Sequence, residues 1–553
     1  MKKPQLFILI LFLITSCQAR KDYDVILRNG LVYDGSGSRP VKMDIAIAGD
    51  TIAALGKLDK MTGSTEIDAT GLAVAPGFIN MLSWANEALI ADGRSQGDIR
   101  QGVTLEVMGE GSSDGPLNAT MKQARKKTQG DIKFNIPWTT LREYLDYLVK
   151  RGVSCNVASF IGATTVRVNV LGYVDRPPTP EELSRMKLMV KEAMENGAVG
   201  LSSSLIYPPA FYASTGELIE MAKVAAQYDG LYISHMRSEG DHLMAGLDEL
   251  IRITKEAGIR SEIYHLKAAG QKNWPKMDLA ITRIDSARAA GLQISADMYT
   301  YTAAATGLGA CFPPYAEEGG NDAWMKRLKD PKIRARFKEE IGEPADNWEN
   351  FYDLVGSPDK ILLAGFAVDS LKKYTGKNLA EVAALRKTDP IETMMDLVAM
   401  NGQDVSAVYF LMSEDNIKKQ VLLPYVSFGS DAESESPEGV FLKSNPHPRA
   451  YGNFARLLGK YVRDEKVISM EEAIRRLTSL PAANLRLDRR GLLKKGYFAD
   501  LVVFNPDSIA DRATFTQPHQ YASGMVHVFV NGKQVLKSGK HTGAKPGRVV
   551  TRH

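Results

Sequence analysis

Residues 231–267, LYISHMRSEGDHLMAGLDELIRITKEAGIRSEIYHLK, decide the fold of this chain. Two short apolar runs, 231–234 and 261–264, enclose a segment, 243–257, in which apolar residues recur at helical spacing. A strand, a helix and a second strand in this order indicate a parallel βα unit, because the helix returns the chain to the same end of the sheet. The stretch therefore predicts a parallel sheet covered by helices.

The same alternation continues on both sides of this unit. Further strand-like runs lie at 103–108 and 293–296, and further helical segments at 181–196 and 214–228. About eight such units close a barrel, whose active site lies at the carboxyl ends of the strands. We therefore predict an α/β fold in which residues 76–490 form a (β/α)8 TIM-like barrel.

Two parts of the chain fall outside this pattern. From about 307 to 403 the strand repeat is lost, which predicts an insertion after a late barrel strand that forms a lid or pocket wall. Short strands and Asn-Gly turns recur at both ends of the chain. They predict a small β-sandwich domain assembled from residues 23–75 and 491–550.

The N-terminus has the features of an export signal. Lys2 and Lys3 precede the apolar run 6–14, which is too short to span a membrane. The sequence LITSC resembles a bacterial lipobox, so we expect residues 1–17 to be a lipoprotein signal peptide ending at the lipidated Cys17. An ordinary secretory signal is the alternative. The first interpretation predicts an exported, membrane-anchored lipoprotein that faces the periplasm or the cell surface.

Composition sets the class of protein. The chain has 553 residues, is 44% hydrophobic and carries a formal net charge of +4. This length and apolar content are enough for a large core and more than one domain. The small net charge, with no run of Lys or Arg along one face, gives no support to a nucleic-acid partner.

Three polar residues follow predicted strands, namely His235, His265 and Asp431. Either histidine alone has a plain structural explanation as a hydrogen-bonded group. Together on one barrel they predict a metal site, because two neutral imidazoles can bind one ion at about 2.1 Å. Asp431 would then take a proton from a metal-bound water, whose pKa the ion lowers.

A group of motifs in a fixed order resembles one family. SHMRSEG, YHLK, GSD and NPHPRAYGNF are similar to motifs of the D-aminoacylase (N-acyl-D-amino-acid deacylase) family of the amidohydrolase superfamily, and the resemblance extends over residues 24–547. It implies that His235 and His265 bind zinc and that Asp431 is the catalytic acid and base. It also implies that four residues orient the substrate and hold its carboxylate: Lys267, Arg449, Tyr299 and Tyr207.

The chain departs from this family at three metal ligands. Leu82 and Trp84 stand where the family has a His-x-His pair, and the turn that usually contains a zinc-binding Cys reads MGEGS. A second metal ion is therefore not expected. Glu110 in that turn offers a carboxylate, so we expect one divalent ion, with zinc first among the candidates, bound by Glu110 and the two histidines. The alternative is that Glu110 does not bind the metal itself and contacts only a metal-binding residue or the substrate.

These expectations define a reaction. The protein would cleave the amide bond of N-acyl-D-amino acids to a carboxylic acid and a free D-amino acid, with Asp431 as general base and acid for a metal-bound water. Its partner would be a small N-acyl amino acid or a short peptide. Two alternatives stay open: an amidohydrolase acting on dipeptides with a D-residue or on cyclic amides, and a catalytically inactive ligand-binding lipoprotein.

Overall fold

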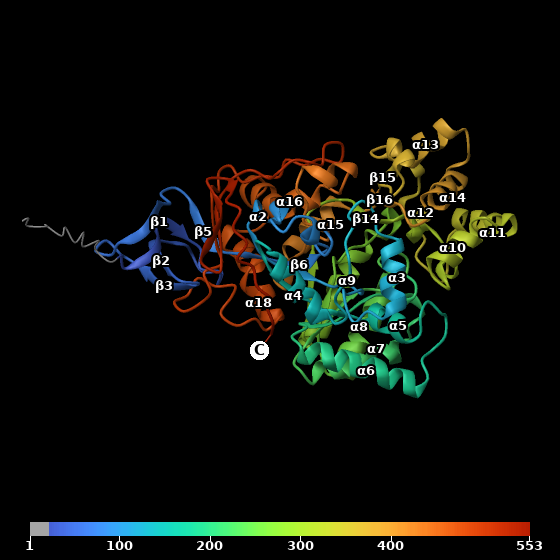
Figure 1. Cartoon of the computed structure of the whole chain (residues 1–553), viewed down its shortest axis with the longest axis horizontal. Helices are drawn as coiled ribbons and strands as arrows, with labels where there is room; N and C mark the ends of the chain where they lie inside the picture. Colours follow the sequence, from blue (N-terminus) through green and yellow to red (C-terminus); the bar gives the residue numbers. More distant parts are fainter. Residues whose placement is uncertain (1–20, 553) are drawn as a thin grey trace, which may run out of the picture.

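The computed structural model describes residues 21–552, which form a β domain, a barrel and an inserted layer (Figure 1). The predicted signal peptide and Cys17 lie outside the described residues. Within the described part of the chain, no helix is both long enough and apolar enough to cross a membrane.

The β domain is built from both ends of the chain. Its strands form one sheet in the order β21-β20-β19-β18-β5-β1-β2-β3, with β4 beside β1. The two ends meet where β5 pairs with β18, with Val74 opposite Val503. The strands are β1 (Tyr23–Val32), β2 (Val41–Ala48), β3 (Thr51–Gly56), β4 (Gly63–Asp68), β5 (Ala73–Pro76), β18 (Leu501–Phe504), β19 (Met525–Val530), β20 (Lys533–Lys537) and β21 (Lys540–His541).

Parallel strands form the barrel in two arcs, β6-β7-β8 and β17-β13-β12-β11-β10-β9. The arcs join where Val199 N donates to Ser159 O at 3.1 Å and where Asp431 N donates to Leu82 O at 2.9 Å. The strands are β6 (Phe78–Ser83), β7 (Val103–Met108), β8 (Asn156–Ser159), β9 (Ile161–Gly162), β10 (Gly200–Ser204), β11 (Leu231–His235), β12 (Arg260–Ile263), β13 (Ile294–Met298) and β17 (Val426–Phe428). The predicted barrel and the β domain from both termini are confirmed.

Helices cover the barrel, and the longer ones bury one apolar stripe. In α8, Leu247, Leu250 and Ile253 are buried at helical spacing. A buried ion pair, with Arg167 Nη1 at 2.5 Å from Glu217 Oε2, links α5 to α7. The helices are α1 (Ala88–Ala91), α2 (Gln96–Ile99), α3 (Ala119–Lys127), α4 (Leu141–Arg151), α5 (Ala163–Val170), α6 (Pro180–Glu195), α7 (Thr215–Ala226), α8 (Leu243–Ala257), α9 (Lys276–Ala289), α15 (Glu414–Val421), α16 (Arg449–Arg456), α17 (Met470–Leu477) and α18 (Ser479–Asn484).

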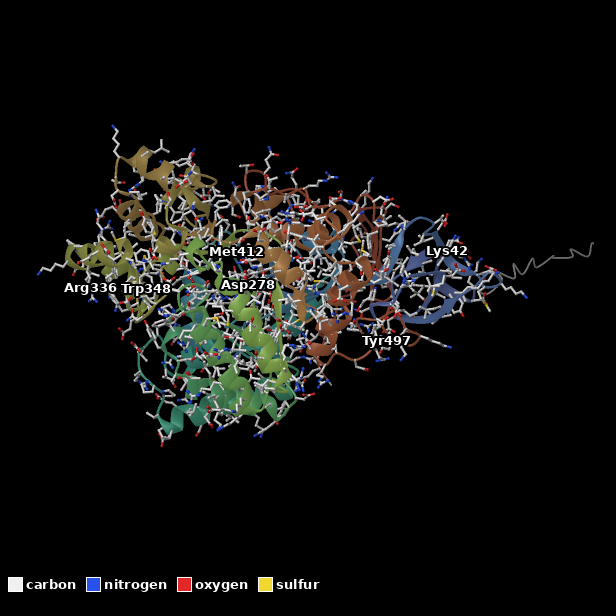
Figure 2. The ribbon with its side chains drawn as sticks, turned by 180° about the vertical axis from the view of Figure 1, so that it is seen from behind. Lys42, Asp278, Arg336, Trp348, Met412 and Tyr497 are labelled. Atoms are coloured by element: carbon white, nitrogen blue, oxygen red, sulfur yellow. The ribbon has the colours of Figure 1, made fainter. Side chains whose placement is uncertain are left out.

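The inserted layer has its own small antiparallel sheet, in the order β14-β16-β15, and its own apolar core around Trp324 and Phe337. Its strands and helices are β14 (Ala304–Gly307), α10 (Asn321–Arg327), α11 (Pro331–Gly342), α12 (Phe351–Val355), β15 (Ile361–Gly365), α13 (Leu379–Arg386), α14 (Pro390–Asn401) and β16 (Ser406–Tyr409). Figure 2 shows Arg336 of this layer at the opposite end of the molecule from Lys42 of the β domain. The layer extends a few residues beyond the predicted range at each end, because β14 and β16 pair with each other.

Candidate active site

A cavity of about 600 Å³ opens at the carboxyl ends of the barrel strands. Barrel residues form its floor, and residues of β14, β15 and β16, such as Thr306, Ala364 and Val408, form one wall. The inserted layer therefore lines the pocket next to the barrel.

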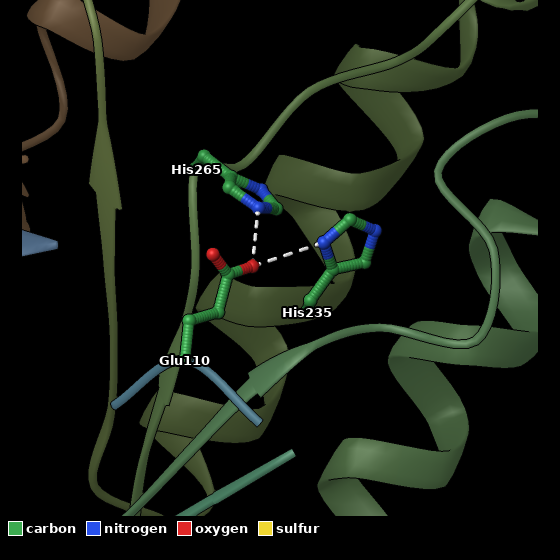
Figure 3. A group of neighbouring side chains, drawn as sticks. All are labelled: Glu110, His235 and His265. Carbon is green, nitrogen blue, oxygen red and sulfur yellow. Dashed lines mark hydrogen bonds and ion pairs between the residues drawn. The ribbon is translucent and has the colours of Figure 1, made fainter. Parts of the chain in front are cut away.

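Glu110, His235 and His265 form a tight group on the floor of the cavity (Figure 3). His235 is the last residue of β11. Glu110 lies two residues after the end of β7, and His265 lies two residues after the end of β12. Glu110 Oε1 lies 3.1 Å from His235 Nδ1 and 3.0 Å from His265 Nε2. All three side chains are buried. The barrel thus brings together possible metal ligands from three distant parts of the sequence.

Two glycines place Glu110 in this group. Gly109 and Gly111 have φ of +99° and +63°, a backbone region that favours glycine. A Cβ at Gly109 would meet Phe160 O at 2.6 Å, and one at Gly111 would meet Ser204 Oγ at 2.4 Å. The turn after β7 can therefore take this tight path only with glycine on both sides of Glu110.

The donor set fits a zinc ion. Two imidazole nitrogens and one carboxylate oxygen lie within 4.8 Å of one another. Ligand atoms at about 2.1 Å from a tetrahedral zinc are separated by about 3.4 Å, a few tenths of an ångström more than the observed contacts to Glu110 Oε1. Two histidines and one carboxylate are a common catalytic zinc set that leaves a position open. Glu110, His235 and His265 are thus able to hold the metal without a change in fold.

Glu239 contacts His265 from behind and lies near His235, and it was not among the predicted site residues. Its Oε1 lies 2.9 Å from His265 Nδ1 and accepts from Lys267 Nζ at 2.7 Å, while its Oε2 lies 3.6 Å from His235 Nε2. A carboxylate on the outer ring nitrogen directs the lone pair of the inner nitrogen toward a metal. The sequence signal that could have identified Glu239 is its position in SHMRSEG, four residues after His235.

The charges in this group are strongly coupled. Burial and the Lys267 ammonium favour neutral His265, but Glu239 and Glu110 raise the pKa of His265 to about 10. Burial would raise the pKa of Glu110, yet His265 and His235 hold it well below its usual range. Two buried carboxylates thus stabilise positive charge between them, which is the electrostatic environment that a divalent cation requires.

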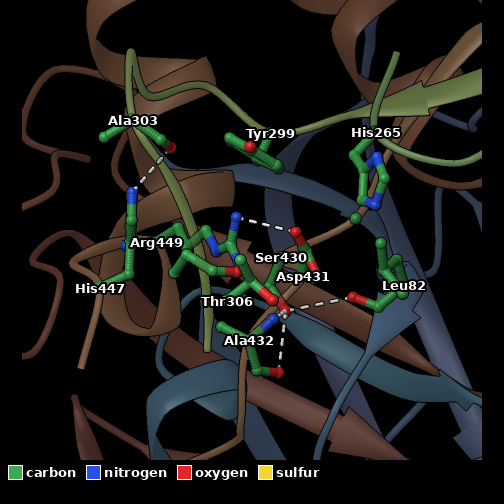
Figure 4. A network of polar contacts seen from close by, with 12 residues as sticks. Leu82, His265, Tyr299, Ala303, Thr306, Ser430, Asp431, Ala432, His447 and Arg449 are labelled. Carbon is green, nitrogen blue, oxygen red and sulfur yellow. Dashed lines mark hydrogen bonds and ion pairs between the residues drawn. The ribbon is translucent and has the colours of Figure 1, made fainter. Parts of the chain in front are cut away.

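Asp431 follows β17 and faces the same cavity (Figure 4). Arg449 Nη1 lies 2.8 Å from Asp431 Oδ2, and the Arg449 guanidinium lies 4.4 Å from the ring centre of Tyr299. Burial raises the pKa of Asp431, and Arg449 opposes that shift. The backbone of Asp431 has φ of +50°, a left-handed conformation that is costly outside glycine and often occurs at functional sites.

The remaining predicted substrate residues also line this cavity. Lys267 is not free, because its Nζ donates to Glu239 and lies 2.6 Å from His265 Nδ1. Tyr207 donates to Thr306 Oγ1 at 2.8 Å, and Tyr299 donates to Met412 Sδ at 3.2 Å. Both tyrosines are therefore held by the inserted layer or the segment that leaves it.

His447 is a further residue of the site with a positioning role. It is buried, its Nε2 donates to Ala303 O at 3.0 Å and its Nδ1 accepts from Arg449 N at 3.0 Å. Burial and the Arg449 charge hold the pKa of His447 far below its usual value. A neutral His447 thus fixes the start of α16, from which Arg449 reaches Asp431.

The positions where the resemblance leads one to expect His-x-His are occupied differently. Leu82 is fully buried in an apolar cluster that includes Phe160 and Tyr264. Trp84 lines the cavity, and its Nε1 donates to Glu110 Oε2 at 2.9 Å and to Asp431 Oδ1 at 3.2 Å. Neither side chain can bind a metal ion.

Comparison with known proteins identifies the family. An amidohydrolase family model matches residues 363–536. D-aminoacylase of Alcaligenes xylosoxydans xylosoxydans is 32% identical over 538 residues, covering 96% of this chain and 98% of that protein. The chain belongs to the D-aminoacylase family. As an amidohydrolase it is a hydrolase that acts on carbon–nitrogen bonds other than peptide bonds.

Other relatives agree with this assignment. N-acyl-D-aspartate deacylase of the same organism is 31% identical over 95% of each chain. The solved structure of N-acyl-D-glutamate deacylase from Bordetella bronchiseptica, with zinc and a phosphonate that mimics the tetrahedral intermediate, is 28% identical with a TM-score of 0.81, covering 96% of this chain and all of that one. This D-aminoacylase-family chain has a candidate zinc site and a pocket for a small molecule.

Proposed function

We propose that the protein hydrolyses N-acyl-D-amino acids to a carboxylic acid and a free D-amino acid, with one divalent metal ion. One observation carries the proposal: the buried group of Glu110, His235 and His265 shares a cavity with the Asp431–Arg449 pair in a chain of the D-aminoacylase family. A D-aminoacylase structure that is 30% identical concerns a binuclear centre with one-metal activation and second-metal attenuation. A single-ion site is in keeping with that behaviour.

The side chains divide the chemistry between them. A zinc ion held by the Glu110 group would supply a Lewis acid for the amide carbonyl and lower the pKa of water. Asp431 is a carboxylate of the cavity that can accept the proton of the attacking water and return it to the leaving nitrogen. Its raised pKa suits both steps, because a carboxyl that is harder to ionise is a stronger base once ionised.

Arg449, and Lys267 beside its partner Glu239, would provide the positive charge for the substrate carboxylate. Arg449 has a planar guanidinium that can bind a carboxylate through two parallel hydrogen bonds. In the structure this guanidinium is paired with Asp431, so substrate binding would divide its hydrogen bonds between the two carboxylates. In this proposal the leaving nitrogen of the substrate would lie next to Asp431.

Release of free amino acid from matched N-acetyl-D- and N-acetyl-L-amino acids tests the proposal. We expect turnover of D-substrates by zinc-loaded protein, and a loss of about 10²- to 10⁴-fold in kcat in Asp431→Asn with metal content unchanged. Undiminished turnover in Asp431→Asn would remove Asp431 from this role. Faster hydrolysis of D-residue dipeptides or hydantoin-like rings would favour the alternative substrates, and binding without any product would favour the inactive lipoprotein.

We also propose that the protein is exported and anchored to a membrane by acyl chains on Cys17. The support is the LITSC sequence after a short apolar run. Expression of the full chain followed by membrane fractionation tests this proposal, with Cys17→Ala as the matched variant. We expect the unchanged chain in the membrane fraction and the variant outside it. Equal distribution of the two would refute lipidation.

A further inference from the structure

Trp84 occupies the catalytic cavity in an unusual way. Trp84 is 39% exposed, yet its indole N–H donates to Glu110 Oε2 and Asp431 Oδ1. An exposed tryptophan can donate its N–H to water at little cost, so burial does not force the N–H onto a protein acceptor. The need to satisfy a buried donor therefore does not explain this orientation. The two acceptors are the carboxylates for which metal binding and proton transfer are proposed above.

One hydrogen atom thus lies between two carboxylates that would otherwise repel each other. Glu110 has its other oxygen, Oε1, directed to the two imidazoles, and Asp431 has its other oxygen, Oδ2, directed to Arg449. Each carboxylate is therefore held at both oxygens. The indole N–H fixes which oxygen of Glu110 faces the metal group and which oxygen of Asp431 faces Arg449.

We propose that Trp84 is a positioning residue that takes the place of a second cation, holding the carboxylates of Glu110 and Asp431 with one neutral N–H donor. The inference rests on the proposed metal-dependent hydrolysis. A hydrogen bond to a carboxylate is charge-assisted and directional, so it orders the site without a second ion. Leu82, buried in its apolar cluster, has no part in this function.

Removal of the N–H while the ring is kept tests the inference. In Trp84→Phe we expect the zinc dissociation constant to rise about 10-fold and kcat to fall about 10- to 100-fold, the usual effect of losing a group that orients a metal ligand. KM should stay within about twofold, because the bulk of the ring remains. Trp274→Phe is the matched control, since Trp274 Nε1 donates at 2.9 Å to Leu411 O, a backbone oxygen. It should leave zinc affinity and kcat unchanged.

A spectroscopic measurement on the unaltered chain gives an independent answer. The five tryptophans should give five indole N–H signals, and that of Trp84 is assigned by its loss in Trp84→Phe. We expect slow exchange of this proton with D₂O and a shift when zinc is added. Exchange as fast as that of a freely exposed indole, or wild-type zinc affinity and kcat in Trp84→Phe, would overturn the inference.

The two proposals fail in different ways. If the unaltered protein hydrolyses no N-acyl amino acid, the proposed function is wrong, and the exchange rate of the Trp84 proton and the zinc affinity of Trp84→Phe decide the role of the indole. If the protein is active but Trp84→Phe behaves as Trp274→Phe does, the function stands and the role of Trp84 is refuted.

Discussion

Replacement of Glu110 by glutamine should show whether Glu110 is a metal ligand or only a supporting contact. In the wild-type protein, Oε1 faces His235 and His265 while Oε2 accepts from Trp84. Glutamine has one oxygen and one NH₂ group. If its oxygen faces the metal, its NH₂ group meets the Trp84 N–H, and two donors then face each other.

The size of the effect follows from that conflict. An unsatisfied buried donor costs about 1–3 kcal/mol, which corresponds to an increase of about 5- to 150-fold in the zinc dissociation constant. Loss of the negative charge beside a divalent cation adds to this cost, so we expect zinc to bind at least about 100-fold more weakly in Glu110→Gln. The fold should be preserved, because the two side chains have nearly the same shape.

Competition with a chromophoric chelator measures this dissociation constant directly, and the number of ions per chain in the purified protein provides a second readout. We expect about one zinc per wild-type chain. A change of less than about fivefold in Glu110→Gln would show that Glu110 does not bind the metal. Absence of zinc from the wild-type protein at saturating metal would refute the site as a whole.

The other predictions concern charge pairs. In Arg449→Met we expect the acidic limb of the pH profile of kcat to move to higher pH. The proposed base Asp431 works only when it is ionised, and loss of the Arg449 charge, which lowers the pKa of Asp431, raises that pKa. An acidic limb that stays in place contradicts the pairing. In Arg167→Leu, the free energy of unfolding measured with urea should fall by about 3–5 kcal/mol, because Glu217 is left buried and unpaired. Arg142→Ala, which breaks an exposed pair, is the control and should cost about 0.5 kcal/mol or less.

The barrel was predictable because its signal is local and repeated. The run 231–267 contains a strand, a helix and a strand, and the structure has β11, α8 and β12 in that order. The order of strand and helix sets the fold class, and the position of a residue after a strand places it at the catalytic end. His235, His265 and Asp431 were therefore selected without knowledge of any contact.

The inserted layer was less predictable from sequence. Its sheet pairs β14 with β16, which are separated by about a hundred residues, and short strands with such distant partners have no periodic signal of their own. Loss of the strand–helix repeat identified the region, but it could not show that Tyr207 would donate a hydrogen bond to Thr306.

The sequence by itself determined which groups are available: two imidazoles, Asp431 and a carboxylate in a glycine turn, with no histidine at positions 82 and 84. Only the tertiary structure decided how they are used. It joined Glu110 to both histidines and turned the Trp84 N–H toward two carboxylates. The physical reason is that a barrel brings residues from different strands within hydrogen-bond distance, and these contacts depend on side-chain direction, which no local pattern encodes.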